Sequence, residues 1–291
     1  MKRLVLVITA ILFAAPAFGE SVDKRIDAAS DGLVRVSNRA GSITIEGGRG
    51  NDVHVTGEMG RNVEDVLVER DGDVVTIEVK APKSEKRGIS TDLDIRVPAG
   101  SSIKVNGVSV DIEVSGVRGE QRLETVSGDI DTTAFAADVQ ANTVSGDVEI
   151  EGDGSEAECV GETVSGDVML VNVAGEATAA SVSGDVSIEG SKLDRAEITT
   201  VSGEVSFESE LGPGGRLHAE AVSGEIELDF AGTIAGRFEL DTHNGDIDNC
   251  FGPEPQRKSK YTPGMTLHFQ EGDGDARVTA STVNGDISIC R

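Results

Sequence analysis

The sequence has no tryptophan, one tyrosine and eight phenylalanines in 291 residues, whereas it has 36 glycines. Large aromatic side chains supply much of the buried area in compact globular cores. A chain with so few of them must build a thin core from valine, isoleucine and leucine. This composition favours a solenoid over a globular β-sandwich.

Basic residues are also scarce: 26 Lys and Arg stand against 52 Asp and Glu, and no Lys or Arg occurs between Leu123 and Ser191. A surface of this sign repels nucleic acid and anionic lipid, so we expect no nucleic-acid partner. We interpret the acidic stretch as a solvated face. The alternative is a surface for cations or for a cationic partner.

Long apolar runs are absent except at the N-terminus. Lys2 and Arg3 precede an apolar run, and the small residues Ala17 and Gly19 stand just before Glu20. This pattern is typical of a secretory signal peptide over residues 1–19, cleaved after Gly19. We therefore expect a periplasmic or secreted protein with no transmembrane segment after cleavage.

A five-residue motif, Val-Ser-Gly-Asp-Val, recurs through the rest of the chain. Its glycines are 18 to 21 residues apart as far as Gly245, and 40 residues separate Gly245 from Gly285. A period near 20 indicates one supersecondary unit per repeat. The structural corner glycines are Gly128, Gly146, Gly166, Gly184, Gly203, Gly224, Gly245 and Gly285.

Apolar residues alternate on both sides of each corner, as in Val139 and Ala141 before Gly146 and Val148 and Ile150 after it. A period of two is typical of strands, so each unit has two strands joined by the corner. Stacking equivalent strands about 4.8 Å apart buries these columns. The sequence therefore predicts an all-β, single-domain parallel β-solenoid, or β-helix.

Three details of the corner carry further predictions. We expect glycine there because the turn needs a positive φ. An earlier copy has Val110 in place of glycine, which we interpret as a coil at the edge of the stack. His243 replaces the first valine of the motif, which we interpret as a change in the core near the last coils.

The predicted organisation has three parts. Residues 1–19 form the signal peptide, 20–102 a β-rich N-terminal cap, and 103–291 the solenoid coils. Prolines and a basic run interrupt the repeat at about 249–279, so we expect this excursion to fold over the C-terminal end.

An acidic residue follows each corner glycine, and stacking would place these carboxylates in an acidic ladder. Like charges on neighbouring strands repel by about 0.2–1 kcal/mol per pair. Water, corner amides or divalent cations could offset this, but the Gly-Gly-x-Gly-x-Asp calcium repeat is absent. We therefore expect no metal or other cofactor. The ladder consists of Asp129, Asp147, Asp167, Asp185, Glu204, Glu225, Asp246 and Asp286.

Two of the three cysteines occupy one column of the repeat, because Cys250 and Cys290 each lie five residues after a corner glycine. If the excursion loops out, their coils are neighbours at a distance that allows a disulfide. Cys159 falls in an inward column, so we expect a buried free thiol.

The repeats resemble a known group, the bacterial putative-adhesin domain family of unknown function. The resemblance is carried by the motif copies, by Val97-Pro98-Ala99-Gly100-Ser101-Ser102, and by Gly272-Asp273-Gly274 followed by Thr282-Val283-Asn284-Gly285-Asp286-Ile287. It implies a right-handed β-solenoid at or outside the cell envelope, with no known reaction.

We therefore expect a non-enzymatic, adhesin-like binding or structural module whose partner is an envelope or surface protein or glycan. The alternative is a carbohydrate-active β-helix enzyme, a polysaccharide hydrolase or lyase, for which two acids could suffice. The scarcity of aromatic platforms and of basic residues beside the acids argues against it. A third class, a scaffold stacking end to end, would need an uncapped terminal coil.

Overall fold

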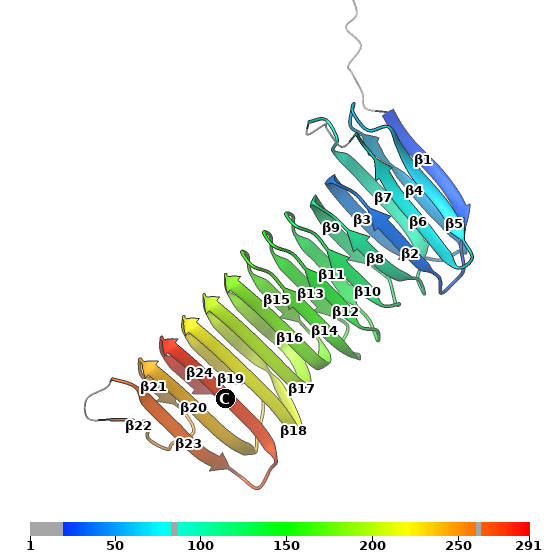
Figure 1. Cartoon of the computed structure of the whole chain (residues 1–291). Coiled ribbons are helices and arrows are strands. Elements are labelled where there is room, and N and C mark those ends of the chain that lie inside the picture. Colours follow the sequence, from blue (N-terminus) through cyan, green and yellow to red (C-terminus); the bar gives the residue numbers. More distant parts are fainter. Residues whose placement is uncertain (1–19, 83–86, 260–262) are drawn as a thin grey trace, which may run out of the picture.

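The computed structural model describes residues 20–82, 87–259 and 263–291, and within them the chain forms a long β-rod (Figure 1). The predicted signal peptide lies outside the described residues. The strands are β1 (Glu20–Asp27), β2 (Leu33–Ser37), β3 (Ala40–Gly48), β4 (Asp52–Met59), β5 (Asp65–Asp71), β6 (Val74–Lys80), β7 (Thr91–Pro98), β8 (Ser102–Asn106), β9 (Ser109–Ser115), β10 (Gln121–Glu124), β11 (Ile130–Ala134), β12 (Val139–Asn142), β13 (Val148–Gly152), β14 (Glu156–Glu162), β15 (Val168–Val171), β16 (Ala174–Ser183), β17 (Val186–Ser202), β18 (Val205–Ser223), β19 (Ile226–Phe230), β20 (Gly236–Asn244), β21 (Ile247–Asn249), β22 (Gln256–Arg257), β23 (Met265–Glu271), β24 (Ala276–Asn284) and β25 (Ile287–Cys290).

Each coil contributes one strand to each of two facing layers. The strand before the corner glycine belongs to layer A, and the strand after it belongs to layer B. In layer A, β10 pairs in parallel with β8 and β12, and in layer B, β11 pairs in parallel with β9 and β13. The long strands β17 and β18 each run from layer B of one coil into layer A of the next. The all-β solenoid predicted from the repeat is confirmed.

The core fills the narrow space between the layers with aliphatic columns. The two apolar positions after each corner point inward, so Val148 and Ile150 are buried. From layer A, Ala141 and Gly161 face them, and an added Cβ at Gly161 would lie 2.9 Å from a methyl carbon of Val168. Small residues in layer A thus let larger ones in layer B fill the interior.

At the N-terminal end, the order of coils in the stack differs from their order in the chain. Strands β2 and β3 lie between the coil of β8 and β9 and the coil of β6 and β7, with parallel pairing on both sides. In Figure 1 the blue strands lie between cyan and green ones. Residues 20–102 therefore contribute coils to the stack as well as a cap. The coil of Val110 is interior, so its assignment to the edge was wrong.

The C-terminal end has a second exchange of order. Strand β24 inserts between β18 and β20, and β25 inserts between β19 and β21, again in parallel. Figure 1 shows red β24 between the yellow and orange strands. The last motif of the chain thus precedes the motif at Gly245 in the stack. The terminal coil is that of residues 236–249.

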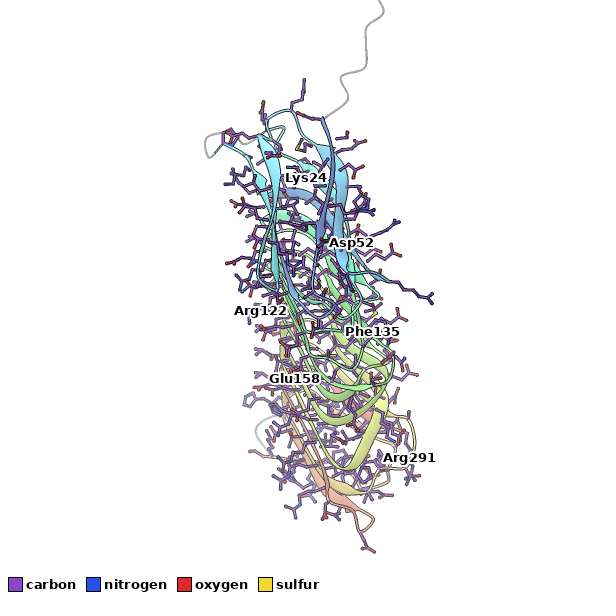
Figure 2. All side chains as sticks on the ribbon, turned by 90° about the vertical axis from the view of Figure 1, so that its right-hand side faces the viewer. Lys24, Asp52, Arg122, Phe135, Glu158 and Arg291 are labelled. Carbon is purple, nitrogen blue, oxygen red and sulfur yellow. A yellow bond between two sulfur atoms is a disulfide. The ribbon has the colours of Figure 1, made fainter. Side chains whose placement is uncertain are left out.

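Antiparallel strands cover both ends of the rod. Strands β1 and β4 extend layer B beyond β7, and β5 pairs with β6 in layer A. The ammonium of Lys24 joins the two layers there through a 2.8 Å ion pair with Asp65 (Figure 2 labels Lys24 at this end). At the opposite end, β23 from the predicted excursion pairs with β20, and Phe269 stacks on Phe238 at 4.5 Å. These strands cover the parallel edges of both layers at the N-terminal end and the edge of β20 at the C-terminal end, whereas β21 pairs only with β25 among the described strands.

Candidate functional site

The corner glycines share a tight contact between neighbouring coils. A Cβ added at any of the eight would approach a backbone carbonyl oxygen of the next corner to well under 3.0 Å, closer than real Cβ atoms come. Five of them have φ between 143° and 157°, as Gly166 does at 146°. Gly184, Gly224 and Gly245 lie outside the left-handed range. The predicted positive φ is therefore found at five of the eight corners, whereas crowding against the neighbouring carbonyl is common to all eight.

A column of Thr and Ser hydroxyl groups links neighbouring corners by hydrogen bonds, and the repeat pattern did not predict it. Thr143 lies three residues before its corner glycine and donates a 3.1 Å hydrogen bond to the carbonyl oxygen of Gly128 in the neighbouring coil. Thr163, Ser181 and Thr200 repeat the bond at 2.9–3.1 Å. The sequence signal was a Thr or Ser directly before most copies of the motif.

The first valine of each motif forms an exposed apolar column that we call the valine ladder. These side chains are 39–49% exposed, whereas the inward columns are almost fully buried. His243 therefore replaces a surface residue, and its interpretation as a change in the core was wrong. The ladder consists of Val108, Val126, Val144, Val164, Val182, Val201, Val222 and Val283.

The acidic ladder lies one residue beyond the glycines and is ordered by backbone amides. The N–H of Asp147 donates to Oδ1 of Asp129 (2.9 Å), and the N–H of Asp167 donates to Oδ1 of Asp147 (2.8 Å). The same bond recurs at the N–H groups of Asp129, Asp185, Glu204 and Asp246. Each such aspartate thus offsets repulsion by capping the next rung with one oxygen.

Repulsion persists beside the ladder, at Asp131 in β11. Burial, followed by the charges of Glu149, Asp129 and Glu113, raises the pKa of the Asp131 carboxyl above its ordinary value. Burial and the charge of Asp185 likewise raise the pKa of Glu204. The rod therefore tolerates unfavourable charge along this face.

Replacing Asp131 by asparagine is expected to raise the melting temperature at pH 7. Because folding raises the pKa of this carboxyl, the folded chain holds its proton more tightly than the unfolded chain, and ionisation at neutral pH opposes folding. The gain should shrink as the pH falls toward the raised pKa. Thermal melts of both proteins from pH 7 to pH 4 measure it, and a variant that melts lower at pH 7 would contradict this account.

From the sequence, we expect the acidic ladder to bind no divalent cation. Among the described residues, no group of three or more His, Cys, Asp or Glu side chains is arranged to hold a metal ion. We expect millimolar Ca²⁺ to raise the melting temperature no more than NaCl of matched ionic strength does. Calorimetry in the two salts decides this, since an excess stabilisation by Ca²⁺ would require a bound ion.

The cysteines separate into a bonded pair and a buried thiol. Cys250 and Cys290 form a disulfide with their Cα atoms 5.0 Å apart, which joins the terminal coil to the inserted coil. Cys159 is free and buried, and burial followed by the charge of Asp138 raises the pKa of its thiol to about 11. Such a thiol is protonated at neutral pH and unreactive.

A shallow apolar groove of about 510 Å³ lies beside the valine ladder on layer A. The residues that line it include Val164, Val182, Val201 and Val222 of the ladder and Ala180 of layer A. No helix in the described chain is long and apolar enough to cross a membrane.

These features define a class: a two-layer parallel β-solenoid with covered ends that presents repeated columns of side chains. The model of the Toastrack DUF4097 family matches residues 34–211 and 163–290, and the chain belongs to that family. No curated protein sequence gives a significant match.

Solved structures that match this chain share little sequence with it. A protein described as a putative adhesin from Bacteroides fragilis is 12% identical, with a TM-score of 0.47 and coverage of 92% of this chain and 96% of that one. A protein described as a putative lipid binding protein from Parabacteroides distasonis is 12% identical, with a TM-score of 0.43 and coverage of 93% and 97%. A protein described as a putative cell adhesion protein from Clostridium sporogenes is 9% identical, with a TM-score of 0.25 and coverage of 93% and 99%.

Proposed function

We propose that this protein is a non-enzymatic, adhesin-like binding module at the cell envelope, periplasmic or secreted, whose partner is a surface protein or glycan. The observation that carries the proposal is the repetition of the same exposed side chains along the corner, coil after coil. A catalytic site needs a local constellation of unlike groups, whereas a repeated surface suits an extended partner. The pattern at residues 1–19 supports export.

The arrangement of the acids favours binding over polysaccharide cleavage. Most aspartates of the acidic ladder accept a hydrogen bond from a backbone amide through one carboxylate oxygen. These bonds hold the aspartates in a like-charged column. Sugar-active clefts present aromatic platforms, but the phenylalanines Phe207, Phe230, Phe238, Phe251 and Phe269 form one contacting cluster at the C-terminal end. Phe207, Phe230 and Phe238 of that cluster are buried in the core, so their rings are not open to a sugar.

The test uses the mature protein beginning at Glu20, labelled and titrated onto isolated envelopes of the producing cells and onto a glycan array. We expect saturable binding to at least one of them, with no reducing ends or unsaturated products released from polysaccharides. The matched control is the heat-unfolded protein. Turnover of a polysaccharide, or no binding above this control, would overturn the proposal.

A further inference from the structure

The valine ladder and the acidic ladder run side by side along one edge, and we call this surface the corner ridge. In each coil the valine and the acid are three residues apart, as in Val164 and Asp167, so roughly 10 Å at most separates the columns. Neighbouring coils stand about 4.8 Å apart. Seven such steps give the ridge a length of roughly 34 Å.

The valine ladder is a continuous apolar stripe. Insertion of the last coil places Val283 directly after Val222 in the stack, because Asn284 pairs with Ser223. Isolated exposed valines are ordinary on a protein surface, but a continuous stripe beside an apolar groove is a feature of interaction sites. Val164 and Val182 belong to both the stripe and the groove.

The acidic ladder beside the stripe carries charge that the rod itself does not neutralise. None of the ion pairs found among the described residues involves a ladder carboxylate. The amide bonds hold Oδ1 of Asp147 and Asp167. Their other oxygens remain for a partner, in a fixed row that loses little entropy on binding.

We propose that the corner ridge binds a cationic amphipathic peptide helix, with its apolar face on the valine ladder and its Lys or Arg side chains over the acidic ladder. This inference rests on the proposed binding function. A helix rises about 1.5 Å per residue, so about 22 residues match the roughly 34 Å ridge. A second copy of this acidic chain or an anionic membrane would bring repulsion instead.

The test measures binding of a fluorescent 22-residue helical peptide, with a leucine face flanked by lysines, by anisotropy at two salt concentrations. The comparison peptides are a scrambled sequence of the same composition and a version with glutamate for lysine. We expect the designed peptide to bind at least tenfold more tightly than either, and more weakly at higher salt.

Two double variants test whether the peptide contacts the valine ladder and the acidic ladder, and a third serves as the control. Val164→Thr with Val182→Thr keeps side-chain shape and should weaken binding about tenfold. Asp147→Asn with Asp167→Asn keeps the amide acceptor while removing charge, so it should weaken binding and flatten its salt dependence. The control, Glu158→Gln with Glu176→Gln, removes two charges from layer A away from the corner and should change nothing (Figure 2 labels Glu158). Circular dichroism checks that all of them fold.

Several results would overturn the proposal. If the scrambled peptide binds as tightly as the designed peptide, or if the layer A control weakens binding as much as the aspartate variant does, overall charge alone would explain the attraction. Valine-dependent self-association in sedimentation, or valine-dependent binding to phosphatidylcholine vesicles, would assign the ridge to a second copy or to lipid. If the protein binds envelopes but not the peptide, only the proposal of a cationic helical partner is wrong. If it binds neither, the proposed binding function is wrong as well.

Discussion

Replacing Gly166 by valine is expected to lower the free energy of unfolding by more than about 3 kcal/mol, above the usual cost of overpacking. The new Cβ would press on the backbone carbonyl of Gly146, which belongs to the neighbouring coil. Backbone in a hydrogen-bonded stack cannot move aside without separating the coils. Chemical denaturation followed by circular dichroism measures the loss.

Two further variants separate crowding from backbone conformation. Gly184 lies outside the left-handed range but has the same close carbonyl, so Gly184→Ala should also destabilise strongly. Gly190 has a φ of 61° and open space around it, so Gly190→Asn should cost at most about 1 kcal/mol. If Gly184→Ala were neutral and Gly166→Val harmful, conformation rather than crowding would explain the glycines.

Ending the chain after Asp275 is expected to abolish the ordered C-terminal end of the rod. This truncation removes β24 and β25, which provide the parallel neighbours of β20 and β21. It also exposes the layer edges at β18 and β19, which invites aggregation. Hydrogen exchange of the truncated protein should show rapid exchange throughout β20 and β21.

A point variant and a deletion provide the controls. Val278→Asp places a charge at a fully buried position of β24 and should reduce protection in both β18 and β20. Deleting β1, which pairs along one edge with β4, should have a smaller effect confined to the N-terminal end. Unchanged protection of β20 in both C-terminal variants would contradict the inserted position of β24.

The pairing of Cys250 with Cys290 shows what periodicity can and cannot predict. Equal distance from a corner glycine places two residues in one column, and this is enough to predict that they can bond once their coils are adjacent. The spacing does not reveal that the coil of Cys290 is the inner one. Strand order is set by which edges bury the most surface, so it depends on contacts that a linear pattern does not contain.

The half-exposed valines show a second limit. Val164 and Val168 are both apolar members of one motif, but Val164 is 44% exposed and Val168 is 1% exposed. The alternation of apolar and polar residues assigns faces correctly within a straight strand. The corner between Val164 and Val168 interrupts that alternation, so the two valines point to different sides. The sequence therefore placed the inward columns and misplaced the valine ladder.

The sequence by itself determined the coil: its length, its two strands, its inward columns and the row of acids, because these follow from a local period of two repeated about every 20 residues. Only the tertiary structure decided which coil lies beside which, why glycine is needed, and which apolar column faces solvent. Those features depend on the approach of backbones far apart in the chain, as when Gly285 packs between Gly224 and Gly245.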